Sequence, residues 1–139
     1  MGIKQFKING SNNYKLNILT NNDIITNPDG VIINIHGIGS HFQFIYLTGD
    51  DIENRFSSFS KINLVSYALE FHGHGKSEGE RCCIYDFDDL VYDLDCLVNY
   101  IKFINSDKPI FILAESMGGG VTIKYEIKHK NKIKGVILL

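Results

Sequence analysis

The sequence lacks long apolar runs, a cysteine framework and a strong excess of charge of either sign. No apolar run approaches the roughly 20 residues of a membrane-spanning helix, and residues 1–6 contain no apolar core of a signal peptide. A net charge of -2 gives no electrostatic reason to expect binding to nucleic acid. The three cysteines, two of them adjacent, have no metal-type spacing and indicate reduced thiols rather than disulfides. These absences favour a cytoplasmic protein.

The length and composition predict one globular domain over residues 1–139. Hydrophobic residues make up 44% of the chain and charged residues 22%, an ordinary globular balance. A chain of 139 residues can bury a substantial core. We find no repeat, low-complexity tract or second-domain boundary in the sequence.

The stretch 109–120 organises the rest of the chain. Residues 110–114 are apolar or small and predict a buried strand, and residues 121–130 have helical character. Between them stand Glu115, Ser116 and three glycines. A strand, a sharp turn with serine at its tip and a helix are typical of a nucleophile elbow. The alternative is an ordinary strand-to-helix turn that carries a surface serine.

An elbow of this kind constrains its neighbours. The residues two before and two after the serine must be small, because the strand and helix backbones pass close together. Ala114 and Gly118 meet that requirement, although Gly is more usual at the first position. The N–H of Met117 would open the helix, where a developing negative charge is stabilised. Ser116 is therefore the candidate nucleophile and Met117 a candidate oxyanion donor.

The remaining elements follow from periodicity and turn residues. A strand pair at 3–8 and 14–19 predicts an antiparallel hairpin, and from the third strand onward strands alternate with helices, which predicts a parallel sheet with helices on both faces. Asp86 should cap a helix that carries one apolar stripe. The later strands are expected at residues 31–36, 62–71, 110–114 and 133–139, and the helices at 44–59, 86–104 and 121–130.

Three glycine-containing loops should meet where parallel strands end, which is where sites form in such sheets. In the first, residues 36–41, Gly37 and Gly39 would let the backbone turn its amides inward. Ile38 would then supply a second oxyanion donor, typically worth about 3 kcal/mol of barrier. We expect His36 to order this loop rather than act as a base. The alternative is a glycine-rich turn without function.

The second loop, residues 72–80, suggests two other sites that we reject. Gly75-Lys-Ser ends like a phosphate-binding loop, but Glu70 stands where that loop needs glycine. His72 and His74 lack a third metal ligand at suitable spacing. A tight turn built on Gly73 and Gly75, with His72 as support beside the site, is the better interpretation.

Taken together, the segments 36–41, 71–81 and 114–119 resemble the α/β-hydrolase family in order and spacing. They are most similar to the monoglyceride lipase and lysophospholipase branch, also described as serine aminopeptidase S33. The similarity covers roughly residues 30–139. It implies that Ser116 is the nucleophile, with Ile38 and Met117 as the oxyanion amides. It also implies cleavage of acyl esters, such as monoacylglycerols or lysophospholipids, without a cofactor. The residues expected to support the site loops are His36, Gly37, Gly39, His72, Gly73, Gly75, Ala114 and Gly118.

One departure from the family pattern concerns the catalytic triad. In this fold an Asp or Glu and then a His follow the serine along the chain. Here the only histidine after Ser116 is His129, expected late in the elbow helix and exposed, with Glu126 beside it. The chain thus resembles the N-terminal part of a hydrolase, without the cap that shapes the acyl pocket and through which such enzymes contact membranes. We expect the last strand to form an open sheet edge.

Three functional hypotheses remain. The first is a serine ester hydrolase whose nucleophile part lies in this chain. The second is a catalytically inactive hydrolase-like protein that binds a ligand or partner. The third, a nucleotide-binding domain, is disfavoured because the phosphate-binding motifs fail. An Asp and a His downstream in the same transcript would favour the first hypothesis.

Overall fold

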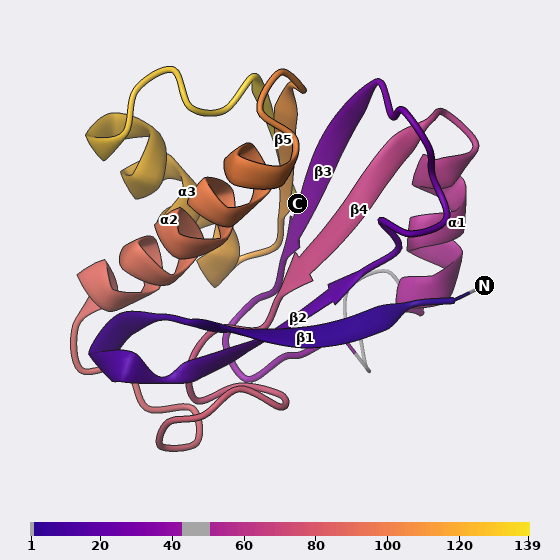
Figure 1. Cartoon of the computed structure of the whole chain (residues 1–139). Helices are drawn as coiled ribbons and strands as arrows, with labels where there is room; N and C mark the ends of the chain where they lie inside the picture. Colours follow the sequence, from indigo (N-terminus) through magenta and orange to yellow (C-terminus); the bar gives the residue numbers. More distant parts are fainter. Residues whose placement is uncertain (1, 43–50) are drawn as a thin grey trace.

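The computed structural model describes residues 2–42 and 51–139. Their strands form a single sheet of six, in the order β1-β2-β4-β3-β5-β6 (Figure 1). The strand bounds are Lys4–Asn9 for β1, Lys15–Thr20 for β2, Gly30–Ile35 for β3, Leu64–Leu69 for β4, Ile110–Ala114 for β5 and Gly135–Leu138 for β6.

The sheet is antiparallel at its N-terminal side and parallel elsewhere. The hairpin strands β1 and β2 pair antiparallel, and β2 pairs antiparallel with β4. The strands β4, β3, β5 and β6 are parallel neighbours. The predicted hairpin, the parallel sheet and the edge position of the last strand are confirmed. The ends of β4, β3 and β5 therefore lie side by side, and the three glycine-containing loops leave the sheet at one edge.

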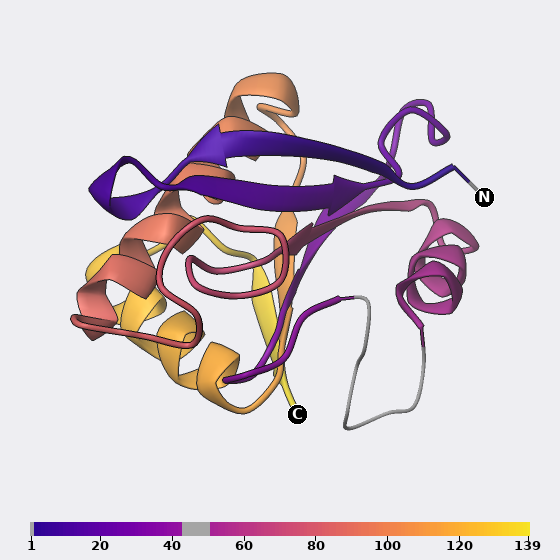
Figure 2. The ribbon, with the colours of Figure 1, turned by 90° about the horizontal axis from the view of Figure 1, so that it is seen from below.

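Helices cover both faces of this sheet (Figure 2). Helices α2 (Phe87–Ile104) and α3 (Met117–Lys128) lie on one face, and α1 (Ile52–Ser60) lies on the other. Two buried clusters follow from this arrangement. The larger joins α2 and α3 to the sheet, and the smaller, around Phe56 and Ala68, joins α1 to β2 and β4. Alternation along β4 explains the division, because Tyr67 belongs to the first cluster and Ala68 to the second.

The predicted helix 86–104 is confirmed nearly to the residue. The carboxylate of Asp86 accepts a hydrogen bond from the Asp88 N–H at 2.8 Å and so caps α2. The apolar stripe of α2 is fully buried, from Leu90 to Ile101. Burial of this stripe against the sheet stabilises the helix far more than its local propensity does.

Two helix predictions need correction. The helix expected at 44–59 corresponds to α1, which begins at Ile52 because Asp51 caps it; residues 44–50 lie outside the described residues. The helix expected at 121–130 begins earlier, at Met117, and ends at Lys128. Its three glycines suggested a turn because glycine has low helix propensity, but they form the first turn of α3. The other boundaries differ by one or two residues.

Candidate functional site

Ser116 stands at the tip of a sharp turn between β5 and α3. Its backbone has φ 48° and ψ -116°, a conformation that non-glycine residues rarely adopt. Such strained residues persist only where their surroundings hold them, and they cluster at functional sites. The side chain makes no capping bond to the helix, and the residue is exposed. The hydroxyl is therefore presented to solvent rather than used by the fold.

Close packing explains the small residues around the serine. A Cβ atom on Gly118 would lie 2.6 Å from Cγ2 of Ile35 and 2.7 Å from the carbonyl oxygen of His36. Ala114 is fully buried at the end of β5. A Cβ atom on Gly37 would lie 3.2 Å from Cβ of Ser116. The loop after β3 thus passes directly beside the serine, as the predicted oxyanion loop must.

The two candidate oxyanion amides are available. Neither the N–H of Met117 nor that of Ile38 donates a hydrogen bond to any described residue. Both follow the strand ends that meet at the serine, and Met117 begins α3, where the helix dipole favours an anion. Gly39 has φ +67° with open space around its Cα, so glycine is needed for the backbone conformation. This arrangement could stabilise an oxyanion next to Ser116.

His36 is fixed inside the site loops. Its Nδ1–H donates to the carbonyl oxygen of Gly37 at 2.7 Å, and its Nε2 accepts from the Phe71 N–H at 3.1 Å. The ring lies 5.3 Å from that of Phe71 and 4.9 Å from that of His74, centroid to centroid. Burial lowers the pKa of His36 to about 3, so the ring is neutral. With both nitrogens in use, His36 joins the first loop to the second.

His72 joins the second loop to α2 and to the hairpin. Its Nδ1–H donates to Oδ2 of Asp93 at 2.7 Å, and both residues are buried. Oδ1 of Asp93 also accepts from the Ser11 N–H at 2.7 Å. Sequence analysis missed Asp93, although a carboxylate inside the apolar stripe of α2, beside Leu94, was the available signal. His72 therefore supports the loop through a buried hydrogen-bond network with Asp93.

Removal of the Asp93 carboxylate should strongly destabilise the fold. In Asp93→Ala the Ser11 N–H and the His72 ring lose a buried acceptor, and each buried donor left unsatisfied typically costs about 1–3 kcal/mol. Urea unfolding measures this loss. Asp89→Ala, on the more exposed side of the same helix, is the matched control and should cost at most about 1 kcal/mol. Equal effects of the two substitutions would contradict the role assigned to Asp93.

Glu70 shapes the second loop. Its buried carboxylate accepts hydrogen bonds from Asn17 Nδ2 at 2.9 Å, the Phe42 N–H at 3.2 Å and the Lys76 N–H at 2.8 Å. Gly75 has φ +50°, and a Cβ atom there would lie 2.2–2.4 Å from this carboxyl group. The residue that excludes a phosphate-binding loop is thus the centre of the turn.

The rest of this loop is held by main-chain contacts. Gly73 has φ +74°, and a Cβ atom on it would lie 2.4 Å from the carbonyl oxygen of Glu80. The Nδ1–H of His74 donates to the carbonyl oxygen of His72 at 3.0 Å. Burial lowers the pKa of His74 and so favours the neutral ring. Within residues 2–42 and 51–139, no three His, Cys, Asp or Glu side chains are grouped to hold a metal ion.

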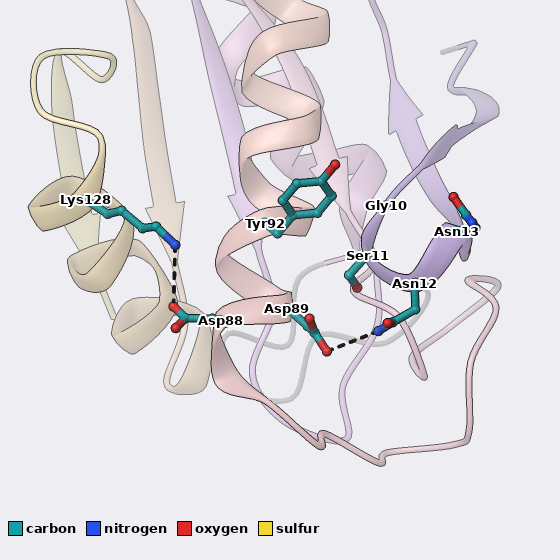
Figure 3. Close-up of a pocket in the computed structure, with 8 residues that line it drawn as sticks. All are labelled: Gly10, Ser11, Asn12, Asn13, Asp88, Asp89, Tyr92 and Lys128. Atoms are coloured by element: carbon teal, nitrogen blue, oxygen red, sulfur yellow. Dashed lines mark hydrogen bonds and ion pairs between the residues drawn. The ribbon is translucent and has the colours of Figure 1, made fainter.

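Two surface cavities lie near these elements, and neither is lined by Ser116. The larger, about 440 Å³, is a polar hollow between the hairpin turn and α2 (Figure 3). There Asn12 Nδ2 donates to Asp89 Oδ2 at 3.2 Å, and Lys128 lies 4.0 Å from Asp88. This hollow holds none of the predicted site residues. The smaller, about 260 Å³, lies between the first two site loops and is lined by Gly39, Ser40, His41, Gly73, His74, Gly75, Lys76, Arg81 and Cys82.

His129 lies far from the serine, as predicted, but is not simply exposed. It follows α3, whose 12 residues span roughly 18 Å. Its ring stacks on Tyr125 at 4.7 Å, and its Nδ1 lies 3.8 Å from Asp95. The prediction of an exposed surface role is wrong, because Asp95 on α2 gives the half-buried ring a partner.

Solved structures of esterases share this architecture. A carboxyl esterase from Bacillus coagulans superposes with a TM-score of 0.78 at 22% identity, over 99% of this chain and 44% of the esterase. An esterase from Pyrococcus furiosus gives 0.75 at 24% identity, over 96% of this chain and 50% of the esterase. The chain has the α/β-hydrolase fold, as the sequence predicted.

The sequence comparisons identify the family to which the chain belongs within this fold. Residues 26–139 match the family described as serine aminopeptidase, S33, and the chain belongs to that family. It is 29% identical to the monoacylglycerol lipase of Mycolicibacterium smegmatis over 113 residues and 30% identical to the monoglyceride lipase of Rattus norvegicus over 112 residues. Each alignment covers 81% of this chain, which spans 38% and 35% of those relatives.

Proposed function

We propose that this chain carries the nucleophile and the oxyanion site of a serine ester hydrolase. The observation that supports it most is the strained backbone of the exposed Ser116, which lies against Gly37 and next to two amides that donate to no described residue, those of Ile38 and Met117. Attack by the Ser116 hydroxyl on an ester carbonyl would form a tetrahedral oxyanion for these N–H groups to stabilise. The relatives' names favour monoacylglycerols or similar acyl esters as the substrate class.

Neither His36 nor His72 is placed to act as the general base. His36 uses both nitrogens, and His72 donates to Asp93. His129 lies at the opposite end of α3. When the base is removed from an intact serine protease, the oxyanion site and substrate binding still accelerate the reaction roughly a thousandfold over water. We therefore expect Ser116 in this chain to react slowly but specifically.

A fluorophosphonate probe tests the proposal directly. The probe should label the purified chain at a measurable rate, and Ser116→Ala should lose that labelling. Ser58→Ala, an exposed serine on α1, is the matched control and should label like the original chain. Labelling that persists in Ser116→Ala, or no labelling of the original chain, would count against catalysis and favour an inactive hydrolase-like binding protein.

Cytoplasmic location and contact with a lipid surface remain part of the proposal. Within the described ranges, no helix combines the length and the apolar character needed to span a bilayer.

A further inference from the structure

A buried ion pair joins α1 to the turn that carries Ser116. Nη1 of Arg55 lies 2.8 Å from Oε1 of Glu115, and the two side chains are only 7% and 4% exposed. Glu115 directly precedes the candidate nucleophile, whereas Arg55 lies 60 residues earlier on the opposite face from α3. The pair therefore links two elements that share no other polar side-chain contact among the described residues.

Glu115 is the residue at which strand becomes turn. Its N–H donates to the carbonyl oxygen of Ile35 at 3.0 Å, which extends the pairing of β5 with β3. Its own carbonyl oxygen accepts from the Gly118 N–H at 2.9 Å, which closes the first turn of α3. The backbone of Glu115 is thus held from both sides, and Arg55 holds its side chain from a third direction.

Arg55 is itself held on a well-anchored helix. Asp51 caps α1 by accepting from the Asn54 N–H at 2.7 Å. Ile52 and Phe56 flank Arg55 on the buried face and pack in the smaller core cluster. A charged residue in such a face is costly unless it is paired. The packing of α1 against the core therefore fixes the position of Arg55.

We infer that Arg55 and Glu115 are positioning residues, which hold the strained backbone of Ser116 in the orientation that exposes this residue beside the loop of Gly37 and Ile38. The inference rests on the proposed function for what that orientation serves. A conformation such as φ 48° persists only when its neighbours fix it, and the ion pair fixes the residue immediately before it. Replacing a buried ion pair with uncharged residues of similar size often leaves stability unchanged, so orientation and stability can be separated.

The test compares reactivity with stability in matched variants of the full chain. The double variant Arg55→Met with Glu115→Gln removes both charges and keeps the side-chain volumes. We expect it to unfold near the urea midpoint of the original chain, yet to react with a fluorophosphonate at least about tenfold more slowly, because small misplacements of a nucleophile carry large rate losses. Arg55→Lys keeps the charge but not the guanidinium, and should react at an intermediate rate. Lys61→Met, at the exposed end of α1, is the control and should react normally.

A second measurement does not depend on reactivity. Amide hydrogen exchange at Gly118 and Gly119, whose N–H groups close the turn by donating to Glu115 and Ser116, should be faster in the double variant, while exchange in α2 is unchanged. If the original chain is not labelled, the proposed function fails, and exchange alone decides the inference. The inference would be overturned if the double variant were labelled at the rate of the original chain, or if exchange at these two glycines were unchanged. If the double variant does not fold, an unimpaired Arg55→Lys would also overturn it.

Discussion

Replacement of Gly118 by alanine should remove the reactivity of Ser116 and destabilise the chain. The new Cβ atom would lie 2.6 Å from Cγ2 of Ile35, 2.7 Å from the carbonyl oxygen of His36 and 3.1 Å from that of Ile35. Two of these three atoms belong to the backbone of β3 and the oxyanion loop, so they cannot move aside as a flexible side chain could. The start of α3 must therefore shift away from β3, and overpacking of this kind costs about 1–3 kcal/mol.

The shift would also separate the serine from the loop after β3. Gly37 lies against Ser116, and Ile38 follows it, so displacement of α3 moves the hydroxyl and the Met117 amide relative to the Ile38 amide. We expect labelling by a fluorophosphonate to fall about 100-fold, as for a misplacement of about 1 Å. Labelling kinetics and urea unfolding of the same preparation measure both effects.

Gly120, in the same turn of α3, provides a control position at which alanine should raise the stability of the chain. It is exposed, and the nearest atom to its added Cβ is Cζ of Phe87 at 3.6 Å, an ordinary contact. Gly120→Ala should therefore stabilise the chain by about 0.5–1 kcal/mol through helix propensity and leave labelling unchanged. If Gly118→Ala labelled like Gly120→Ala, close packing of α3 against β3 would not be what positions the serine.

The elbow could be predicted because its constraints are local. A short strand, a serine and an immediately following glycine group occupy adjacent positions, and the close approach of backbones leaves few residue types possible at Gly118. The parallel sheet was predictable for a similar reason, since alternation of strands with helices permits few topologies. The bounds of α3 were harder to predict from the sequence, because tertiary contacts stabilise a helical turn of three glycines that helix propensity alone disfavours.

The supports of the site could not be predicted in the same way. The contact of Arg55 with Glu115 and that of His72 with Asp93 join residues that are 60 and 21 positions apart in the chain. Nothing in a local pattern sets which polar side chains meet in the folded chain. What the sequence does contain is a charged residue at a buried helical position, Arg55 between Ile52 and Phe56. Such a residue requires a partner, and only the fold identifies it.

His36 should make the folded state sensitive to acid. Burial lowers its pKa from 6.5 to about 3, because a protonated ring would be desolvated and Nε2 already accepts from the Phe71 N–H. In the unfolded chain the ring takes up its proton near pH 6.5, whereas in the folded chain it does not do so until about pH 3. Above pH 6.5 both states are neutral and His36 has no effect. As the pH falls from 6.5 towards 3, the unfolded state is increasingly favoured.

The expected loss of unfolding free energy from this residue is about 3 kcal/mol by pH 4.5. Burial lowers the pKa of His74 as well. The contribution of His36 must therefore be measured with a variant that changes His36 alone. His36→Gln retains an acceptor for the Phe71 N–H but cannot be protonated, and it should reduce the pH dependence between 6.5 and 4.5 by about one proton. Urea unfolding at a series of pH values measures this slope. The imidazole resonance of His36 should also stay unchanged down to pH 4.5, and a titration of that resonance near pH 6.5 would show that the ring is not sealed between the two site loops.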